Sequence, residues 1–307
     1  RSTSLLNYRS SVRSKESMKP YKNQIGVHAL VWVGDWSKES CRTAIKNSAE
    51  AGYSLIEIPA LDPASIDTAD TVKVLKEFNM NAACSLGLSF DADINNEDPA
   101  IVKRGEDRLF AALGVVEALG GNYLGGVTYS ALGKYQTPPT EKARTNAVNS
   151  LRRLAQSAKS RGISLGLEPV NRYESNLINT ADQCLSVISD IGEDNVYVHL
   201  DVYHMNIEEQ DLVAPVIASG KKLGYVHVGA SHRGPLGTGN IDFDSFFGAL
   251  AKIGFTGPIT FESFSSSVVS KDLSNTLGIW RNLWTDNKSM AKSSREYLEA
   301  KLAKAYS

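Results

Sequence analysis

The chain has 307 residues, a formal net charge of −1 at pH 7 and a pI of about 6.6. This near balance of charge excludes the basic face that nucleic acids and anionic membranes attract, so neither is expected as a partner. No apolar run approaches the roughly 20 residues of a membrane span. The function must therefore come from a site built by particular side chains.

The three cysteines are Cys41, Cys84 and Cys184. They are odd in number, widely spaced and not in a Cys-x-x-Cys pattern, so neither a disulfide framework nor a zinc–thiolate site is expected. Small buried side chains in a reducing compartment are the simpler reading, and we expect a cytoplasmic protein.

The first 17 residues are rich in Ser and Arg, and Glu16 is their one acid. This composition is typical of a targeting remnant, and it also fits vector-derived residues ahead of Met18. We therefore treat residues 1–22 as an extension outside the core. The folded domain is expected over residues 23–307.

From residue 24 onward, short runs rich in β-branched residues alternate with longer stretches of helical period. Eight strands are predicted near residues 25–32, 55–59, 82–88, 123–128, 163–170, 196–202, 224–229 and 258–263. Helices are predicted between them near residues 38–51, 68–78, 99–119, 140–161, 180–191, 210–219 and 243–253, and further helices should cover much of the remainder.

Eight uninterrupted strand-then-helix units predict one parallel α/β sheet closed into a (β/α)₈ TIM barrel, with additional C-terminal helices. An open doubly wound sheet usually carries a Gly-rich turn after its first strand. The sequence has no G-x-G-x-x-G after a strand and no P-loop, which disfavours a nucleotide cofactor.

Four chemically active residues stand in or just after the last four predicted strands. They are Glu168, Asp201, His227 and Glu262. Catalytic groups of TIM barrels lie at the carboxyl ends of the strands, and a buried carboxylate is costly unless it is paired or binds a metal. Three carboxylates and one imidazole suit Mn²⁺, Mg²⁺ or Co²⁺ better than structural zinc. The sequence therefore predicts one divalent metal ion.

Glu168 and Glu262 could flank a substrate carbon from two sides, one removing a proton and the other returning it. With a metal polarising a neighbouring oxygen, this pair suits epimerisation or isomerisation beside a carbonyl. Glu174, His204 and Arg233 follow in the adjacent loops, where they could bind hydroxyl groups or only anchor the loops.

Several stretches resemble the D-tagatose/D-psicose (D-allulose) and L-ribulose 3-epimerase family, within the xylose-isomerase-like TIM barrels. The resemblance runs from about residue 24 to about residue 305. The stretches that carry it are residues 168–174 (EPVNRYE), 199–209 (HLDVYHMNIEE), 227–233 (HVGASHR), 246–250 (FFGAL), 262–264 (ESF) and 278–281 (GIWR).

The resemblance implies a ketose 3-epimerase that interconverts free ketohexoses and ketopentoses through a cis-enediolate, such as D-tagatose/D-sorbose, D-fructose/D-psicose and L-ribulose/L-xylulose. Glu168 and Glu262 would exchange protons at C3, and the quartet would bind the metal, usually Mn²⁺. Homodimers or homotetramers are common in this family. The residues implied in substrate binding are Glu174, His204, Arg233, Trp36, His28 and Phe264.

Three positions depart from the family pattern. His28 stands where relatives have Phe or Tyr, Ser263 replaces Pro, and Leu132 replaces a Trp. These departures leave the preferred ketose open. The alternative functions are an aldose–ketose isomerase or inosose dehydratase on the same barrel, or a sugar-binding protein without catalysis.

Overall fold

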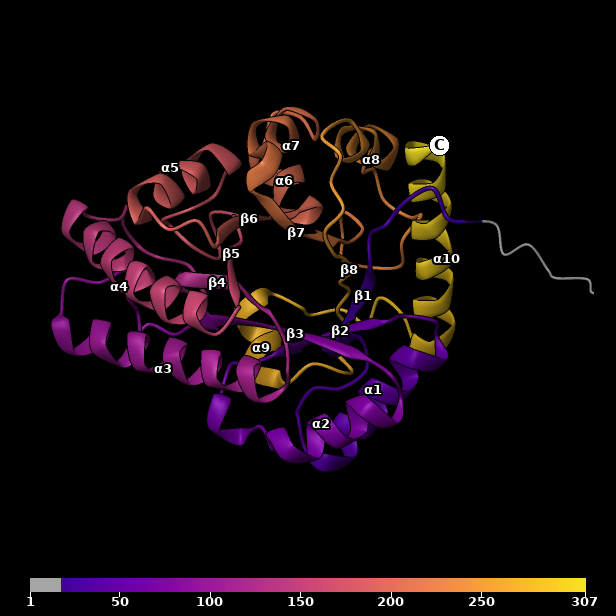
Figure 1. Cartoon of the computed structure of the whole chain (residues 1–307), viewed down its shortest axis with the longest axis horizontal. Helices are drawn as coiled ribbons and strands as arrows, with labels where there is room; N and C mark the ends of the chain where they lie inside the picture. The colour runs from indigo at the N-terminus through magenta and orange to yellow at the C-terminus, as the bar shows by residue number, and fades with distance from the viewer. Residues whose placement is uncertain (1–17) are drawn as a thin grey trace, which may run out of the picture.

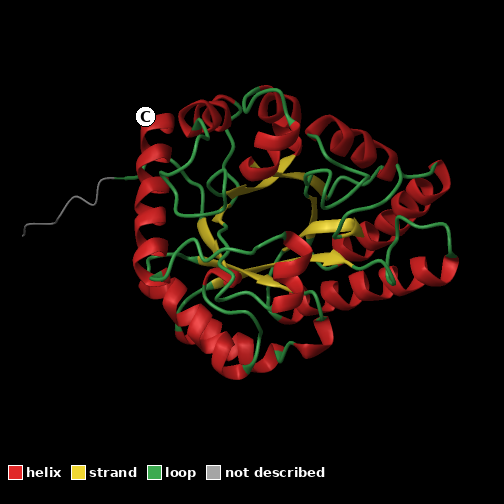
Figure 2. Ribbon diagram, turned by 180° about the vertical axis from the view of Figure 1, so that it is seen from behind, coloured by secondary structure: helices red, strands yellow, loops and turns green. Residues whose placement is uncertain are grey.

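A computed structural model describes residues 18–307, so residues 1–17 of the predicted extension over residues 1–22 lie outside the described part. Eight parallel strands form a closed barrel, in which each strand pairs with its neighbours in sequence and β8 closes on β1 (Figures 1 and 2). The predicted TIM barrel is confirmed. The strands are β1 Ile25–His28, β2 Leu55–Pro59, β3 Asn81–Leu88, β4 Tyr123–Ala131, β5 Ser164–Leu167, β6 Val196–Asp201, β7 Leu223–Val228 and β8 Ile259–Phe261.

Helices surround the barrel, and α10 runs along its flank beside α8 (Figure 1). The helices are α1 Lys38–Glu50, α2 Thr68–Glu77, α3 Pro99–Ala118, α4 Glu141–Ser160, α5 Ala181–Ile191, α6 Val202–Glu208, α7 Ala214–Ser219, α8 Phe243–Lys252, α9 Lys271–Leu277 and α10 Asn287–Tyr306. Short 3₁₀ turns lie at Ala29–Val31, Pro63–Ser65 and Gly220–Lys222. Between residues 18 and 307, no helix combines the length and the apolar character that crossing a bilayer requires.

The boundaries differ from prediction where a side chain or a proline ends the strand ladder. β1 ends at His28 rather than near residue 32, because the Leu30 N–H turns back to donate to His28 Nδ1 at 3.2 Å and starts a 3₁₀ turn. β5 ends at Leu167 rather than near residue 170. The residue after Glu168 is Pro169, which has no N–H for the ladder.

The sixth helical region was predicted as one helix over residues 210–219. The structure has two helices, of which α6 follows β6 directly and α7 begins at Ala214. Asp201 starts α6, because its Oδ1 accepts the Tyr203 N–H at 2.8 Å in an N-cap. This cap holds one oxygen of the Asp201 carboxylate in place at the rim of the barrel.

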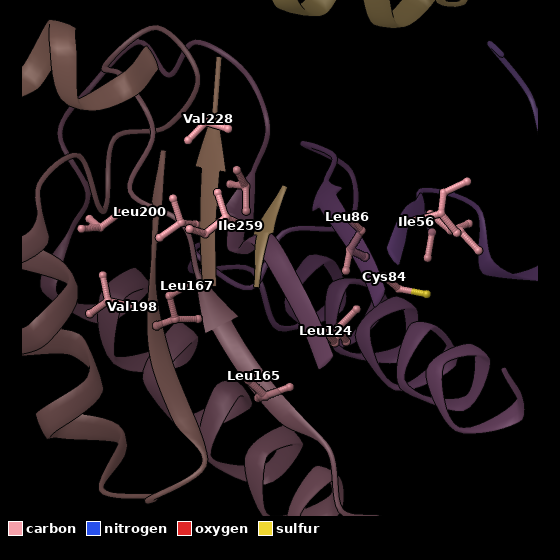
Figure 3. Close-up of a cluster of buried hydrophobic side chains, with 14 of the residues drawn as sticks. Ile56, Cys84, Leu86, Leu124, Leu165, Leu167, Val198, Leu200, Val228 and Ile259 are labelled. Carbon is pink, nitrogen blue, oxygen red and sulfur yellow. The ribbon is translucent and has the colours of Figure 1, made fainter. Parts of the chain in front are cut away.

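Side chains alternate between the two faces of each strand, and the two faces differ in character. The set that includes Ile56, Leu124 and Val198 belongs to the main core, where the strands meet the helices (Figure 3). Alternate residues form a separate small cluster of Leu55, Ala83, Tyr123 and Tyr225. The apolar face of the sheet thus secures the helices, and the other face is free to carry polar groups inside the barrel.

Tyr123 fills the interior below the strand ends. Its ring stacks on Tyr225 with centroids 4.4 Å apart, and its hydroxyl lies 2.8 Å from Nδ1 of His199. His199 is fully buried, as expected for an interior histidine. The tyrosine fits because β5 has glycine opposite it: a Cβ atom at Gly166 would lie 1.7 Å from the Tyr123 hydroxyl.

We predict that Gly166→Ala lowers the free energy of unfolding by about 3 kcal/mol, because the added methyl forces Tyr123 out of its place. The control is Gly114→Ala in α3, where a Cβ would meet nothing within 4 Å. That change should raise stability by about 0.5 to 1 kcal/mol through helix propensity. Urea unfolding of both variants measures the difference. Equal stability of Gly166→Ala and the wild type would contradict this packing.

Candidate active site

A cavity with about 530 Å³ of empty space lies at the carboxyl ends of the strands. Three members of the predicted quartet, Glu168, His227 and Glu262, line it. The fourth, Asp201, is 2% exposed and contacts the same histidine. The four residues come from the ends of β5, β6, β7 and β8, which the closed barrel brings together.

Nδ1 of His227 is the point on which the quartet converges. It lies 3.0 Å from Glu262 Oε2 and 3.2 Å from Glu168 Oε1. Asp201 Oδ2 is 3.7 Å away. One oxygen from each of three carboxylates therefore surrounds a single ring nitrogen, in a region where all four side chains are buried.

The other nitrogen of His227 binds a residue that the sequence analysis missed. Nε2 lies 2.6 Å from Oε1 of Glu57, a fully buried carboxylate in the middle of β2. The second oxygen of Glu57 accepts a hydrogen bond from Ser85 Oγ at 2.8 Å and lies 3.1 Å from His28 Nε2. The sequence carried one signal for Glu57. It is the single acid within an apolar strand, and it lies two residues after Leu55, which faces inward.

The contact with Glu57 decides which nitrogen of His227 faces the quartet. Because Nε2 donates to Glu57, Nδ1 is the nitrogen that can present a lone pair to an ion among the three carboxylates. Burial favours the neutral ring, but the surrounding carboxylates, Glu57 foremost, outweigh it and raise the pKa of His227 well above its usual range. The pKa of Glu57 is held well below its usual range because the two histidines outweigh its burial.

In Glu168, burial outweighs the effect of His227 on the pKa of the carboxyl group. Burial, with the nearby charges of Asp201 and Glu262 adding to it, raises the pKa of the Glu168 carboxyl to about 8. Buried carboxylates so close together repel one another unless a positive charge lies among them. The donor set of three carboxylates and one imidazole could supply the ligands of a divalent cation, with one oxygen of Asp201 still engaged in its N-cap.

A second group of polar residues forms the adjoining wall of the cavity. His204 Nδ1 accepts the Asn171 N–H at 2.9 Å, which fixes the ring and turns Nε2 toward Glu174 Oε2 at 3.7 Å. Arg233 Nη1 lies 3.7 Å from Glu174 Oε1 and has no hydrogen-bond partner among the described residues. Glu174, His204 and Arg233 are therefore brought together, with a buried N–H available to a ligand.

The remaining predicted contacts divide into two groups. His28 and Phe264 line the cavity. Both nitrogens of His28 are engaged, Nδ1 by Leu30 and Nε2 by Glu57, so the ring offers its carbon atoms rather than a hydrogen bond to the cavity. Trp36 does not line the cavity. Its indole N–H donates to Thr71 Oγ1 at 3.1 Å, and its ring borders a separate groove beside it.

The family model described as "Xylose isomerase-like TIM barrel" matches residues 45–301. The chain belongs to this family. It is 51% identical over 280 residues to an L-ribulose 3-epimerase of Methylomonas sp. (strain DH-1), covering 91% of this chain and 98% of the relative. It is 46% identical to a ketose 3-epimerase of Arthrobacter globiformis, covering 91% and 96%.

Solved structures of family members agree with the fold. A D-allulose 3-epimerase from Methylomonas sp., crystallised in complex with D-allulose, superposes with a TM-score of 0.90 at 50% identity and covers 92% of this chain and 98% of that one. These relatives confirm the resemblance and the expectation that the chain is an isomerase of the epimerase type.

We predict that Glu57→Gln weakens Mn²⁺ binding by about 10- to 100-fold, because an amide no longer holds His227 Nε2–H as a charged acceptor does. Isothermal titration with Mn²⁺ measures the change. The matched control is Glu106→Gln, where the lost carboxylate pairs with Arg153 in the outer layer of helices. An unchanged Mn²⁺ dissociation constant in Glu57→Gln would show that Glu57 does not orient His227 for an ion.

Proposed function

We propose that the chain is a metal-dependent ketose 3-epimerase, in which Glu168 and Glu262 move a proton at C3 of a free ketose. One observation carries the proposal. The carboxylates at the ends of β5 and β8 both lie within 3.2 Å of the same nitrogen of His227, so they approach one point of the cavity from different strands. The names of the relatives support the same reaction.

Glu168 and Glu262 would divide the two proton transfers at C3 between them. One glutamate removes the C3 proton as a general base, and the other delivers a proton to the opposite face, which inverts the carbon. For the opposite epimer the two roles exchange. The intermediate between these events is the cis-enediolate, in which C2 and C3 are planar. Glu174, His204 and Arg233 bind the oxygens at the C1–C2 end and hold the carbon between the two carboxylates.

The ion would be held by Glu168, Asp201, His227 and Glu262, and we propose Mn²⁺, with Mg²⁺ or Co²⁺ as substitutes. Three carboxylate oxygens are hard donors that suit these ions, and the imidazole adds a nitrogen that they also accept. When bound, such an ion polarises the substrate oxygens and stabilises the negative charge that develops beside C3.

The charge of the cavity supports a neutral sugar as substrate. Among the described residues that line the cavity, Arg233 is the only arginine, and none is a lysine. The carboxylates of Glu57, Glu168, Glu174 and Glu262 line the same space. A phosphate group would meet more negative than positive charge, so we expect free ketoses rather than sugar phosphates.

The alternatives differ in where the proton moves. An aldose–ketose isomerase would shift hydrogen between C1 and C2, and an inosose dehydratase would release water. Within residues 18–307, every group of possible metal ligands includes residues that line this one cavity. A sugar-binding protein would not need two carboxylates that approach one point of its cavity from different strands.

The deciding experiment incubates the Mn²⁺-loaded protein in D₂O with D-fructose, D-tagatose and L-ribulose in separate reactions. We expect D-psicose, D-sorbose and L-xylulose, each with deuterium at C3, resolved by chromatography and NMR. D-Fructose 6-phosphate should not be converted. Aldose products with deuterium at C1 or C2 would indicate an isomerase instead, and binding without deuterium incorporation would indicate a binding protein.

Glu262→Gln should lower kcat by at least about 10²-fold, the lower range of a general acid–base contribution, while Mn²⁺ is kept saturating. Glu168 would remain able to exchange the C3 proton that faces it. Deuterium should therefore enter one epimer without formation of the other, and Glu168→Gln should label the opposite epimer. Glu296→Gln on exposed α10 serves as the control. Near wild-type epimerisation by Glu262→Gln would refute the two-carboxylate scheme.

Two further expectations accompany this function. Trp280, between α9 and α10, is 77% exposed, and an exposed ring of this size supports our proposal of a homodimer or homotetramer. All three cysteines are free and buried, which supports the proposal of a reducing, cytoplasmic location.

A further inference from the structure

Ser263, the residue after Glu262, ties three segments of the rim together. Its side chain is fully buried. The hydroxyl donates to the main-chain oxygen of Arg233 at 2.6 Å and accepts the indole N–H of Trp284 at 2.9 Å. The end of β8, the loop after β7 and the connection between α9 and α10 thus meet at one oxygen atom. With both partners in place, the hydroxyl is fully engaged by protein.

Arg233, the partner of this hydroxyl, has an unusual backbone. Its φ is +62°, and Asn79 is the one other non-glycine residue with positive φ in the described part of the chain. A residue with a Cβ adopts this left-handed region only where its surroundings hold it there. The holding contacts are on the peptide groups of Arg233: its N–H donates to Ala230 O at 2.9 Å, and its oxygen accepts from Ser263 and from the Phe264 N–H at 3.3 Å.

The guanidinium of Arg233 lies between two aromatic rings, and its Nη2 is 3.2 Å from Nε2 of His204. The Cζ atom is 3.8 Å from the centroid of the Tyr203 ring and 4.9 Å from that of Phe264. Only 8% of the residue is exposed. Its nearest carboxylates, those of Glu174 and Glu262, are 3.7 and 3.8 Å away, which is too far for direct hydrogen bonds. Nη1 has no protein partner among the described residues. The guanidinium is placed between two rings with an N–H left over for a ligand.

We infer that Ser263 is a positioning residue for substrate binding, which acts by holding Arg233 in its left-handed conformation so that the guanidinium can bind the carbonyl end of the ketose. The inference rests on the proposed function for the identity of that ligand. Ser263 does not touch the substrate itself, since its hydroxyl is engaged by Arg233 and Trp284. A proline at this position would have no hydroxyl and could not hold Arg233 in this way.

The test compares Ser263→Ala with Ser265→Ala. Ser265 is equally buried two residues later, but its hydroxyl binds Asn282 and Ser267 and has no contact with Arg233. Loss of the Ser263 hydroxyl should raise KM for the best ketose about tenfold, on the scale of one lost hydrogen bond, with kcat changed by less than about threefold. Ser265→Ala should leave both constants within about twofold of the wild type.

A double mutant separates positioning from a general loss of stability. In an Arg233→Lys background, Ser263→Ala should change KM by less than about twofold, because the group through which it acts has been altered. A full tenfold effect in that background would overturn the inference. So would a Ser263→Ala enzyme with a lower melting temperature and the KM of the wild type.

Crystal structures of the ligand-free wild type and Ser263→Ala give a readout that needs no turnover. We expect Arg233 to leave the left-handed region in the variant and its guanidinium to leave the space between Tyr203 and Phe264. An unmoved Arg233 would overturn the inference. If the wild type converts no ketose at all, the proposed function fails, and this comparison still decides whether Ser263 holds Arg233.

Discussion

The hydrogen bond between His227 and Glu57 is the contact on which the rest of the site depends. In this contact Nε2 of the buried imidazole lies 2.6 Å from a buried carboxylate oxygen of Glu57. Nδ1 of the same ring then lies within 3.7 Å of one oxygen from each of three further carboxylates. Without Glu57 the ring would be free to rotate or to change tautomer. With it, the four groups form a preorganised set of donors whose mutual repulsion a divalent cation would relieve.

The barrel makes this arrangement possible through the alternation of its strands. Outward side chains such as Ile56 and Val198 bury apolar surface against the helices (Figure 3). Inward positions can therefore be polar at the rim, where Glu57 and His227 meet across the barrel, and aromatic further down, where Tyr123 packs on Tyr225. Stability comes from one face of each strand and chemistry from the end of the other face.

Much of this was predictable from the sequence because it follows from periodicity and position along the strands. The eight strands and the quartet were predicted because each quartet member lies in or directly after one of the last four apolar runs. Glu57 was missed because it lies in the middle of its strand, and only the alternation that starts at Leu55 marks it as inward-facing. The short α6 was missed for a different reason: the cap that starts it, Asp201, was interpreted only as a metal ligand.

Other features depend on contacts that are distant in sequence. Trp36 was predicted to contact the substrate. In the structure its indole N–H donates to Thr71 on α2 and its ring borders the neighbouring groove, a contact that a linear pattern does not reveal. Ser263 was noted only as a departure from a motif. Its partners, Arg233 and Trp284, are 30 and 21 residues away in opposite directions along the chain. Such residues become interpretable only when the loops above the barrel are placed together.

The most direct test of the central claim is a crystal structure of the Mn²⁺-loaded protein, with the ion located by anomalous scattering. We expect one ion bound by Nδ1 of His227 and by oxygens of Glu168, Asp201 and Glu262, with Nε2 of His227 still hydrogen-bonded to Glu57. An ion bound through Nε2, or one located away from this quartet, would contradict it.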